Sequence, residues 1–383
     1  MEPVLREIRL QNLLSFGPDT PPLELKSLNV LIGPNGSGKS NLLEAIGLLH
    51  AAPKDLWAPV RESGGVAEWL WQGQRNATAT VEAKIHDPSQ PDSPWQHSFS
   101  FAEQDRRFTV TAERIEKAGA AEPLYVYGGG EFRIQVVDDP SRSQVPRPAI
   151  KTNESILSQR KDPERYPWLS YLSDLYSKFR LYREWSFGRN SPPRQPQKPD
   201  LSAVYLEENC QNLAHVLNAL RLTEKPRLLE LLSTLYPEIK DFSVQFPTGW
   251  VQLFLEENSF NIPATRLSDG TLRFLCLLAI LCHPEPPPLV CIEEPELGLH
   301  PDVLSTLAEL IIDASKRCQL IVTTHSDLLV DNLTEIPDAV VVCEKHKGAT
   351  EMRRLDSERL KAWLEKYTLG QLWMQGELGG TRW

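Results

Sequence analysis

Short runs that alternate apolar and polar residues fill most of residues 78–137. They include TATVEAKI, SFSFAE, RFTVTAERI and FRIQVV, separated by proline and glycine. A period of two is typical of strands that bury one face, so this segment predicts an antiparallel meander. Similar patterns predict strands at 242–246 and 251–256. Apolar runs without alternation, in SLNVLI, PLVCI and QLIVTT, predict strands that are buried on both faces.

Helical spacing appears elsewhere in the chain. An amphipathic helix is expected after residue 38, with Leu42, Leu43, Ile46 and Leu49 on one side, and an apolar helix over 272–282. Further helical stretches are expected around 167–181 and 201–235, on either side of the proline-rich linker SPPRQPQKPD. No sustained heptad repeat occurs, so a long coiled coil is excluded.

Length and composition limit the interpretation further. The chain has 383 residues, enough for two or three structural units or one large domain with an insertion. Hydrophobic residues make up 41% and charged residues 24%, which argues against wholesale disorder. The net charge of -10 argues against indiscriminate binding to nucleic acid or anionic membranes.

Cysteine usage and the apolar runs point to an intracellular environment. The six cysteines form no CxxC pair and lie mostly in apolar runs, which predicts buried reduced thiols: Cys210, Cys276, Cys282, Cys291, Cys318 and Cys343. The N-terminus has no secretory pattern, and the run Phe274–Cys282 is too short to cross a bilayer. We therefore expect a soluble, cytoplasmic protein without membrane contact.

The sharpest motif follows the first buried strand. It consists of Gly33, Pro34, Asn35, Gly36, Ser37, Gly38, Lys39 and Ser40, a full match to the P-loop pattern between a strand and a helix. Glycines let backbone N–H groups surround a phosphate, Lys39 neutralises its β and γ oxygens, and the Ser40 hydroxyl ligates Mg²⁺. The alternative is a glycine turn that merely caps a helix.

Two carboxylates end the strand in PLVCIEEPE. We expect Glu293 to hold the metal through water and Glu294 to polarise the attacking water. The alternative is two solvated carboxylates at a strand end. His325 follows the third buried strand, at the edge where ligands of doubly wound sheets bind, and is expected to contact the γ-phosphate.

The sequence RLSDGTLR precedes the acidic strand. Ser268 is a good N-cap, and with Asp269 and Gly270 it opens the apolar helix, so an ordinary capped helix would explain these residues taken alone. The chain, however, contains the P-loop, LSDGT, IEEPE and TTH in this order, so the four motifs are interpreted together and not one by one.

That order resembles the ABC-type ATPase heads of the RecF, SMC and OLD (overcoming lysogenization defect) families, and most of all their short bacterial branch. The resemblance is strong over residues 1–50 and 260–345. It implies an α/β fold, in which a mainly parallel sheet with flanking helices and an antiparallel β-lobe carry a mostly helical insertion. The expected segments are an N-terminal head part (1–140), the insertion (141–239) and a C-terminal head part (240–383).

The resemblance also implies roles. LSDGT corresponds to the signature motif, IEEPE to the Walker B pair, Leu297–His300 to the D-loop and His325 to the switch histidine. ATP and Mg²⁺ are the expected ligands, with Asn41 added to the ATP-binding residues. Two copies would form an ATP-dependent head-to-tail homodimer, in which each P-loop faces Ser268, Asp269 and Gly270 of the other copy. Asp269 and Glu293 depart from the transporter pattern, and the longer Glu293 would slow turnover.

Several assignments stay open. Gln72 and Gln74 are candidates for the glutamine that senses the γ-phosphate, and Phe16 either stacks on adenine or packs in the core. Residues Lys178–Lys198 hold six basic side chains, a single acidic one and three aromatic rings after Phe179, so any DNA binding is expected there. The alternatives are a solvated face or a docking surface for an acidic partner.

Two functions remain in competition. The first is an ATPase switch in DNA repair or anti-phage defence, without a Toprim nuclease, because the stretch after His325 is too short for that domain; cutting would need a separate effector or nuclease subunit. The second is a nucleotide-controlled scaffold that holds an effector protein without contacting DNA. A transporter subunit fits poorly, since the LSGGQ signature is absent.

Overall fold

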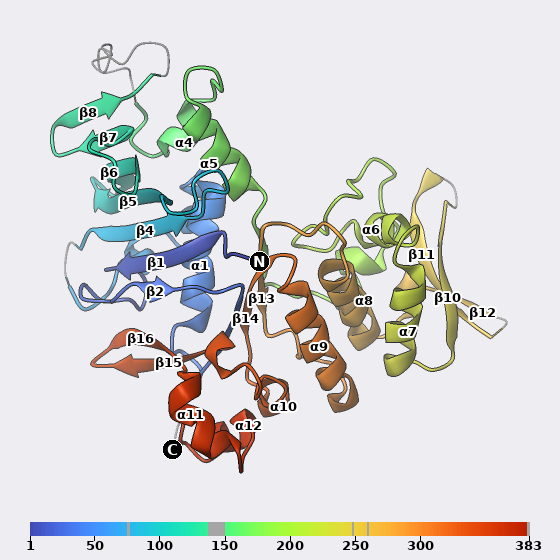
Figure 1. Ribbon diagram of the computed structural model, residues 1–383. Coiled ribbons are helices and arrows are strands. Elements are labelled where there is room, and N and C mark those ends of the chain that lie inside the picture. Colours follow the sequence, from blue (N-terminus) through green and yellow to red (C-terminus); the bar gives the residue numbers. More distant parts are fainter. Residues whose placement is uncertain (75–76, 137–149, 247–248, 259, 381–383) are drawn as a thin grey trace. The chain divides into compact units, whose positions relative to one another are not determined.

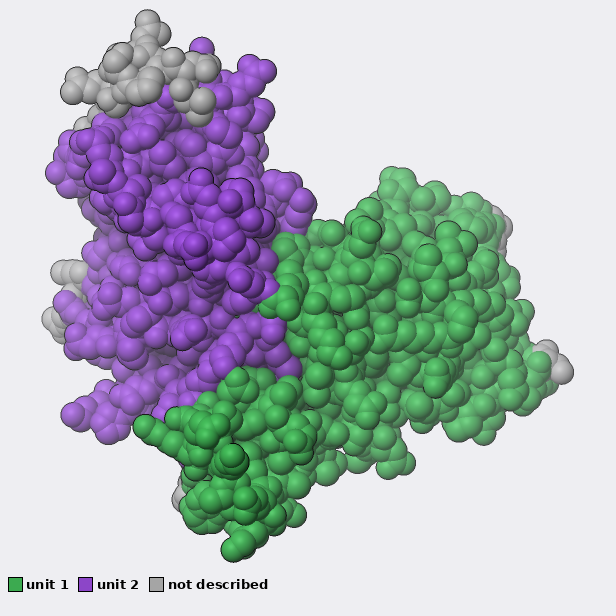
Figure 2. All heavy atoms as spheres, viewed as in Figure 1, with its two compact units in different colours: residues 1, 180–340, 355–378 green, residues 2–179, 341–354, 379–383 purple. Residues whose placement is uncertain are grey.

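The computed structural model describes residues 1–74, 77–136, 150–246, 249–258 and 260–380. These residues form two compact units, shown in different colours in Figure 2. Unit 1 consists of Met1, Arg180–Val340 and Leu355–Leu378, and unit 2 of Glu2–Phe179, Val341–Arg354 and Gly379–Trp383. Each unit is therefore built from separate stretches of the chain. The boundary after Phe179 lies inside the expected insertion, residues 141–239.

Unit 2 contains a seven-stranded antiparallel sheet with the order β2-β1-β4-β5-β6-β7-β8 (Figure 1). Its strands are β1 (Leu5–Gln11), β2 (Leu23–Glu24), β4 (Ala79–Ile85), β5 (Trp95–Gln104), β6 (Arg107–Lys117), β7 (Tyr125–Gly128) and β8 (Glu131–Ile134). In β4 every second side chain is buried, as the alternation in the sequence predicts. The expected meander is therefore confirmed.

The rest of unit 2 surrounds a fully buried strand, β3 (Leu28–Ile32), which lies beside β15 (Val340–His346) in the order β16-β15-β3. β15 pairs antiparallel with β16 (Ala349–Arg354). The long helix α1 (Lys39–Ala51) packs against α5, as Figure 1 shows. The other helices are α2 (Ala58–Glu62), α3 (Val66–Trp69), α4 (Ile156–Gln159) and α5 (Pro167–Ser177).

Unit 1 is centred on parallel strands in the order β14-β13-β9. They are β9 (Arg180–Tyr182), β13 (Leu289–Glu293) and β14 (Gln319–Thr323), and β14 is buried along its whole length. The helix expected over 167–181 ends earlier, at Ser177, because the chain then enters β9 and pairs with β13. Helices α8 (Asp269–Leu281) and α9 (Leu304–Ala314) pack against each other.

A smaller antiparallel sheet in unit 1 has the order β10-β11-β12, made of β10 (Ile239–Gln245), β11 (Gln252–Glu257) and β12 (Phe260–Pro263). Helices α6 (Leu213–Leu220) and α7 (Lys225–Leu235) lie against β10. The helix expected over 201–235 is thus wrong before residue 213. There, the Asn212 amide donates to the carbonyls of Ser202 and Tyr205 at 2.7 and 2.8 Å and so stabilises a loop.

Unit 1 also contains short helices, in which η marks a 3-10 helix. They are η2 (Pro192–Arg194), η4 (Ala264–Arg266), η5 (Pro301–Val303), α10 (Asp327–Asp331), η6 (Pro337–Ala339), α11 (Ser357–Leu364) and α12 (Leu369–Met374). Trp373 in α12 is largely buried, while Trp383 lies outside the described residues. All six cysteines are buried free thiols, as predicted, and burial raises the pKa of Cys282 to about 11. No helix of the described ranges is long and apolar enough to span a bilayer.

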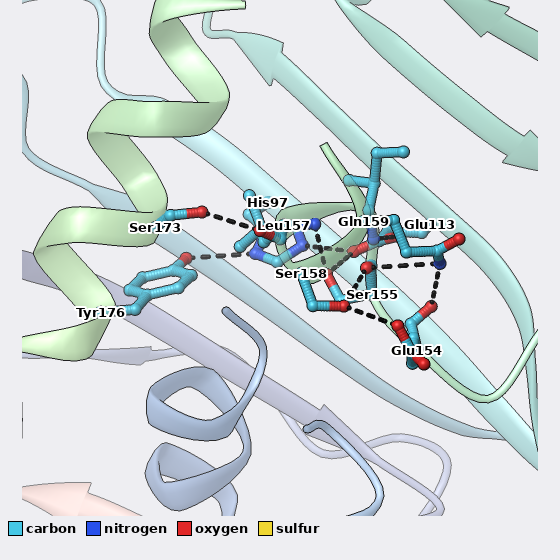
Figure 3. Close-up of polar contacts among 10 residues, drawn as sticks. His97, Glu113, Glu154, Ser155, Leu157, Ser158, Gln159, Ser173 and Tyr176 are labelled. Atoms are coloured by element: carbon cyan, nitrogen blue, oxygen red, sulfur yellow. Dashed lines mark hydrogen bonds and ion pairs between the residues drawn. The ribbon is translucent and has the colours of Figure 1, made fainter. Parts of the chain in front are cut away.

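A buried polar cluster joins the β-lobe to the helices of unit 2 (Figure 3). Glu113 on β6 accepts hydrogen bonds from the Ser155 hydroxyl at 2.5 Å and the Ile156 N–H at 2.8 Å. His97 Nε2 lies 3.2 Å from the same carboxylate, and His97 Nδ1 lies 3.2 Å from the Tyr176 hydroxyl. Because Ser155 is fully buried and directs its proton to a carboxylate rather than to the histidine, the cluster is structural rather than nucleophilic.

Removing the central carboxylate tests this interpretation. In Glu113→Ala the Ser155 hydroxyl, the Ile156 N–H and one nitrogen of His97 lose their buried acceptor, so we expect a loss of about 3 kcal/mol or more in unfolding free energy. Urea unfolding measures it. The control Glu116→Ala on the same strand removes a surface ion pair with Arg114 and should cost at most about 1 kcal/mol. Equal losses in the two variants would contradict the interpretation.

Candidate functional site

The P-loop in unit 2 adopts a backbone that only glycine tolerates well. Gly33, Gly36 and Gly38 have φ angles of 144°, 76° and 102°. A Cβ added at Gly33 would lie 2.2 Å from the Cys343 carbonyl oxygen, and one at Gly38 would lie 2.2 Å from the Thr350 hydroxyl oxygen. The loop is therefore shaped by its glycines and by close packing against β15 and β16, and it leads directly into the N-terminus of α1.

Lys39 folds back over this loop. Its side-chain ammonium donates to the carbonyl oxygens of Gly33 at 2.8 Å and Pro34 at 3.2 Å, and the residue is only 5% exposed. The buried Ser37 hydroxyl finds no hydrogen-bond partner among the described residues. A triphosphate fits this arrangement, because it would supply negative charge beside the ammonium and acceptors for the hydroxyl and the N–H groups.

Two residues outside the motif support the loop, and the sequence reasoning missed both. Thr350 Oγ1 on β16 lies 2.9 Å from the Ser37 carbonyl oxygen and 2.6 Å from the hydroxyl of Ser15, which follows β1. Asn41 donates to the same Ser15 hydroxyl at 2.7 Å. Neither position belongs to a recognisable motif, so only the fold reveals this support.

A cleft of about 640 Å³ opens beside Asn41. It is lined by Leu14, Ser15, Asn41, Glu68, Trp71, Gln72, Gly73, Lys345, Lys347 and Gly348. The Gln72 amide donates to the carbonyls of Ala67 and Leu70 and so caps α3, while Gln74 is exposed. Phe16 is 2% exposed, which settles it as a core residue.

The acidic pair lies in unit 1. Glu293 is the last residue of β13, whereas Glu294 leaves the strand with a φ of 46°. The Glu294 N–H donates to the Thr323 carbonyl at 3.1 Å, so the turn stays attached to β14. At this left-handed turn Glu294 leaves the regular alternation of side chains along the strand.

The predicted switch histidine, His325, lies beside the second of these carboxylates. His325 Nε2 lies 3.5 Å from Glu294 Oε1, and both side chains are partly exposed. Glu296 holds this arrangement, because it accepts hydrogen bonds from the Thr324 hydroxyl at 2.7 Å and the His325 N–H at 2.8 Å. The structure thus brings the predicted Glu294 and His325 together and adds Glu296 as their support.

The signature turn is also in unit 1. The Ser268 hydroxyl accepts the Thr271 N–H at 3.0 Å, which confirms the predicted N-cap of α8. A Cβ at Gly270 would lie 2.8 Å from the carbonyl oxygen of Gly298 in the predicted D-loop, which explains the glycine at this position. Asp269 is largely exposed and forms an ion pair with the buried Arg194.

Three of the six cations of Lys178–Lys198 are engaged inside unit 1. Arg183 forms an ion pair with Glu293 at 3.4 Å, Arg180 lies over the ring of Tyr205, and Arg194 binds Asp269. Lys178 pairs with Asp174 at 2.6 Å but stays exposed, as do Arg189 and Lys198.

No metal-binding cluster of three or more histidine, cysteine, aspartate or glutamate side chains occurs in the described ranges.

Residues 28–331 match the family described as "AAA domain, putative AbiEii toxin, Type IV TA system". The chain belongs to this family. The match runs from β3 to α10 and so includes the P-loop, the signature turn, the acidic pair and the histidine.

Two curated relatives resemble the chain. It is 22% identical to the OLD nuclease of Thermus scotoductus over 331 residues, which cover 81% of this chain and 57% of that protein. It is 34% identical to the DNA double-strand break repair Rad50 ATPase of Sulfolobus acidocaldarius over 85 residues, or 22% of this chain and 9% of that protein. The chain therefore spans little more than half of the first relative's length.

Solved structures show the fold. An SMC head bound to the C-winged helix domain of ScpA has a TM-score of 0.59 at 14% identity, covering 93% of this chain and 99% of that one. A second SMC head, derived from Pyrococcus furiosus, has a TM-score of 0.57 at 13% identity, covering 95% and 99%. Together with the family, these matches confirm the expected α/β fold and an ABC-type P-loop ATPase of the RecF/SMC/OLD kind.

The support of the P-loop by Thr350 gives a test. Thr350→Val keeps the shape of the side chain but removes its hydroxyl, so the Ser37 carbonyl and the Ser15 hydroxyl lose a partner. We expect ATP affinity to fall several-fold, which corresponds to about 1 kcal/mol. Titration with a fluorescent ATP analogue measures this. The control is Thr80→Val, whose hydroxyl pairs with Ser100 in the antiparallel sheet; an equal effect there, or none at Thr350, would contradict the role.

Proposed function

We propose that this protein is an ATP-hydrolysing switch in which two copies close around two ATP molecules. The observation that carries the proposal is the P-loop, whose glycine backbone and folded-back Lys39 fit a triphosphate. The family and the relatives described as ATPases support it. Glu293, Glu294 and His325 would supply the further groups that hydrolysis needs.

Each residue has a distinct task in this proposal. Lys39 would bind the β and γ oxygens, and the N–H groups of Gly36 to Ser40 and Asn41 would hold the phosphate chain. Bound Mg²⁺ would neutralise phosphate charge, held by Ser40 directly and by Glu293 through water. Glu294 would orient and polarise the attacking water, and His325, 3.5 Å from Glu294, would contact the γ-phosphate.

The signature turn of the second copy would complete each site. Ser268 and the start of α8 would present a polar side chain and the positive end of the helix dipole to the γ-phosphate. ATP would then hold the two copies together, and its hydrolysis would release them. Because Glu293 stands where an aspartate is commoner, we expect slow turnover, which suits a switch better than a motor.

For the pathway we propose a cytoplasmic role in DNA repair or anti-phage defence, with a separate effector or nuclease subunit and any DNA contact through Lys178–Lys198. The resemblance to an OLD nuclease and to a Rad50 repair ATPase supports the link to DNA repair. The toxin–antitoxin wording of the family favours the alternative, a scaffold that holds an effector without DNA. Stimulation of ATP hydrolysis by DNA would favour the first role, and co-purification of an effector with no response to DNA would favour the second.

Two variants test the ATPase assignment. Glu294→Gln keeps the side-chain size but removes the charge that polarises water, so hydrolysis should slow by about 100-fold or more. ATP binding should persist, and sedimentation with ATP and Mg²⁺ should show an accumulated dimer.

Lys39→Ala should weaken ATP binding by about tenfold or more, because a charge-assisted contact is lost. Hydrolysis at the wild-type rate in Lys39→Ala would refute the assigned site.

A further inference from the structure

Residues Arg183–Arg194, which we term the strap, lie against the end of the Walker B strand. The Trp185 indole N–H donates to the Glu293 carbonyl at 2.7 Å, and Arg183 pairs with the Glu293 carboxylate at 3.4 Å. The rings of Trp185 and Phe187 stack with centroids 5.8 Å apart. One end of the strap is thus bound to Glu293, through both the backbone carbonyl and the side-chain carboxylate of Glu293.

The other end of the strap reaches the signature turn through Arg194. This residue is 6% exposed, and its guanidinium donates to the Asp269 carboxylate and to the carbonyl oxygens of Leu267 at 2.5 Å and Thr265 at 3.4 Å. It also donates to the Phe187 carbonyl within the strap at 3.1 Å. A single buried cation therefore connects the strap with both sides of the turn.

A second arginine, Arg273 on α8, contacts both rings of the strap and the turn at Glu294. The Arg273 guanidinium lies 4.8 Å from the ring centroid of Trp185 and 5.8 Å from that of Phe187, and it donates to the Glu294 carbonyl at 2.8 Å. Burial lowers its pKa from the ordinary value, while the carboxylates of Glu296 and Glu294 act against this shift. The rings of Trp185 and Phe187 thus contact Arg273 on α8, and the Trp185 ring also binds the Glu293 carbonyl.

Asp269 raises an electrostatic problem at this place. If the signature turn approaches a triphosphate, an exposed carboxylate on that turn repels the phosphate oxygens. An adjacent guanidinium removes most of this repulsion, since paired opposite charges have a weak field at a distance. Arg194 provides it from a buried position, where three backbone carbonyls also bind its guanidinium.

We propose that Arg194 is a positioning residue for ATP hydrolysis, which neutralises Asp269 and fixes the signature turn to the Walker B strand through the strap. This inference rests on the proposed two-copy ATPase. It assigns Arg194, which the sequence places in a basic patch open to DNA, to the interior of the ATPase. The residue acts on the nucleotide of the second copy through Asp269 and touches no substrate itself.

A double-mutant cycle tests the inference on the full-length protein. In Arg194→Gln, kcat should fall by about tenfold or more, while the Kd for ATP of the single copy, set by the P-loop, should change less than twofold. Asp269→Asn in the Arg194→Gln background should restore much of the lost kcat, because it removes the charge left without its cation. The matched control is Arg359→Gln, an exposed arginine paired with Asp356 at 3.2 Å, which should leave kcat unchanged.

Three outcomes would overturn it: a wild-type kcat in Arg194→Gln, a double variant at least as slow as the single one, or a loss of kcat that merely follows a loss of folded protein in urea unfolding. The conservative Arg194→Lys keeps a cation and should retain more activity than Arg194→Gln, which a purely steric role would not predict. Failure of the proposed function itself would look different, since the wild-type protein would then not hydrolyse ATP.

Discussion

The P-loop turns through backbone conformations that need glycine, and this constraint governs the structure around it. Three glycines with positive φ angles make the turn, and at two of them neighbouring atoms leave no room for a Cβ. The surrounding unit is built to hold that turn. β15 and β16 pack against it. Thr350 forms a hydrogen bond to Ser37 in the loop, and Ser15 forms hydrogen bonds to Thr350 and Asn41. The helix α1 begins at the end of the loop.

The other unit is organised by arginines rather than by glycines. Arg194 and Arg273 bind backbone carbonyls at the signature turn and at Glu294, so two segments far apart in the sequence become one rigid group. Buried cations are costly unless they are paired and hydrogen-bonded. Here each guanidinium has several acceptors or aromatic faces, which makes the arrangement specific in geometry as well as tolerable in energy.

The sequence predicts the motifs and the strands that carry them well, because a P-loop, a buried strand and an alternating strand each leave a local pattern. The antiparallel meander and the N-cap at Ser268 are examples. It predicts the helix over 201–235 poorly, since the hydrogen bonds of the Asn212 side chain to the preceding loop override helical spacing. Long-range partners leave no local pattern at all. Arg194 looks like one more cation in a basic segment until the fold places it beside Asp269.

If hydrolysis needs two copies of the chain, its rate must depend on protein concentration. The decisive measurement is the ATP hydrolysis rate per molecule at saturating ATP and Mg²⁺, from nanomolar to micromolar protein. We expect this rate to rise with protein concentration and to level off where sedimentation shows the dimer. A constant rate per molecule at concentrations where sedimentation shows only single copies would contradict the need for two copies.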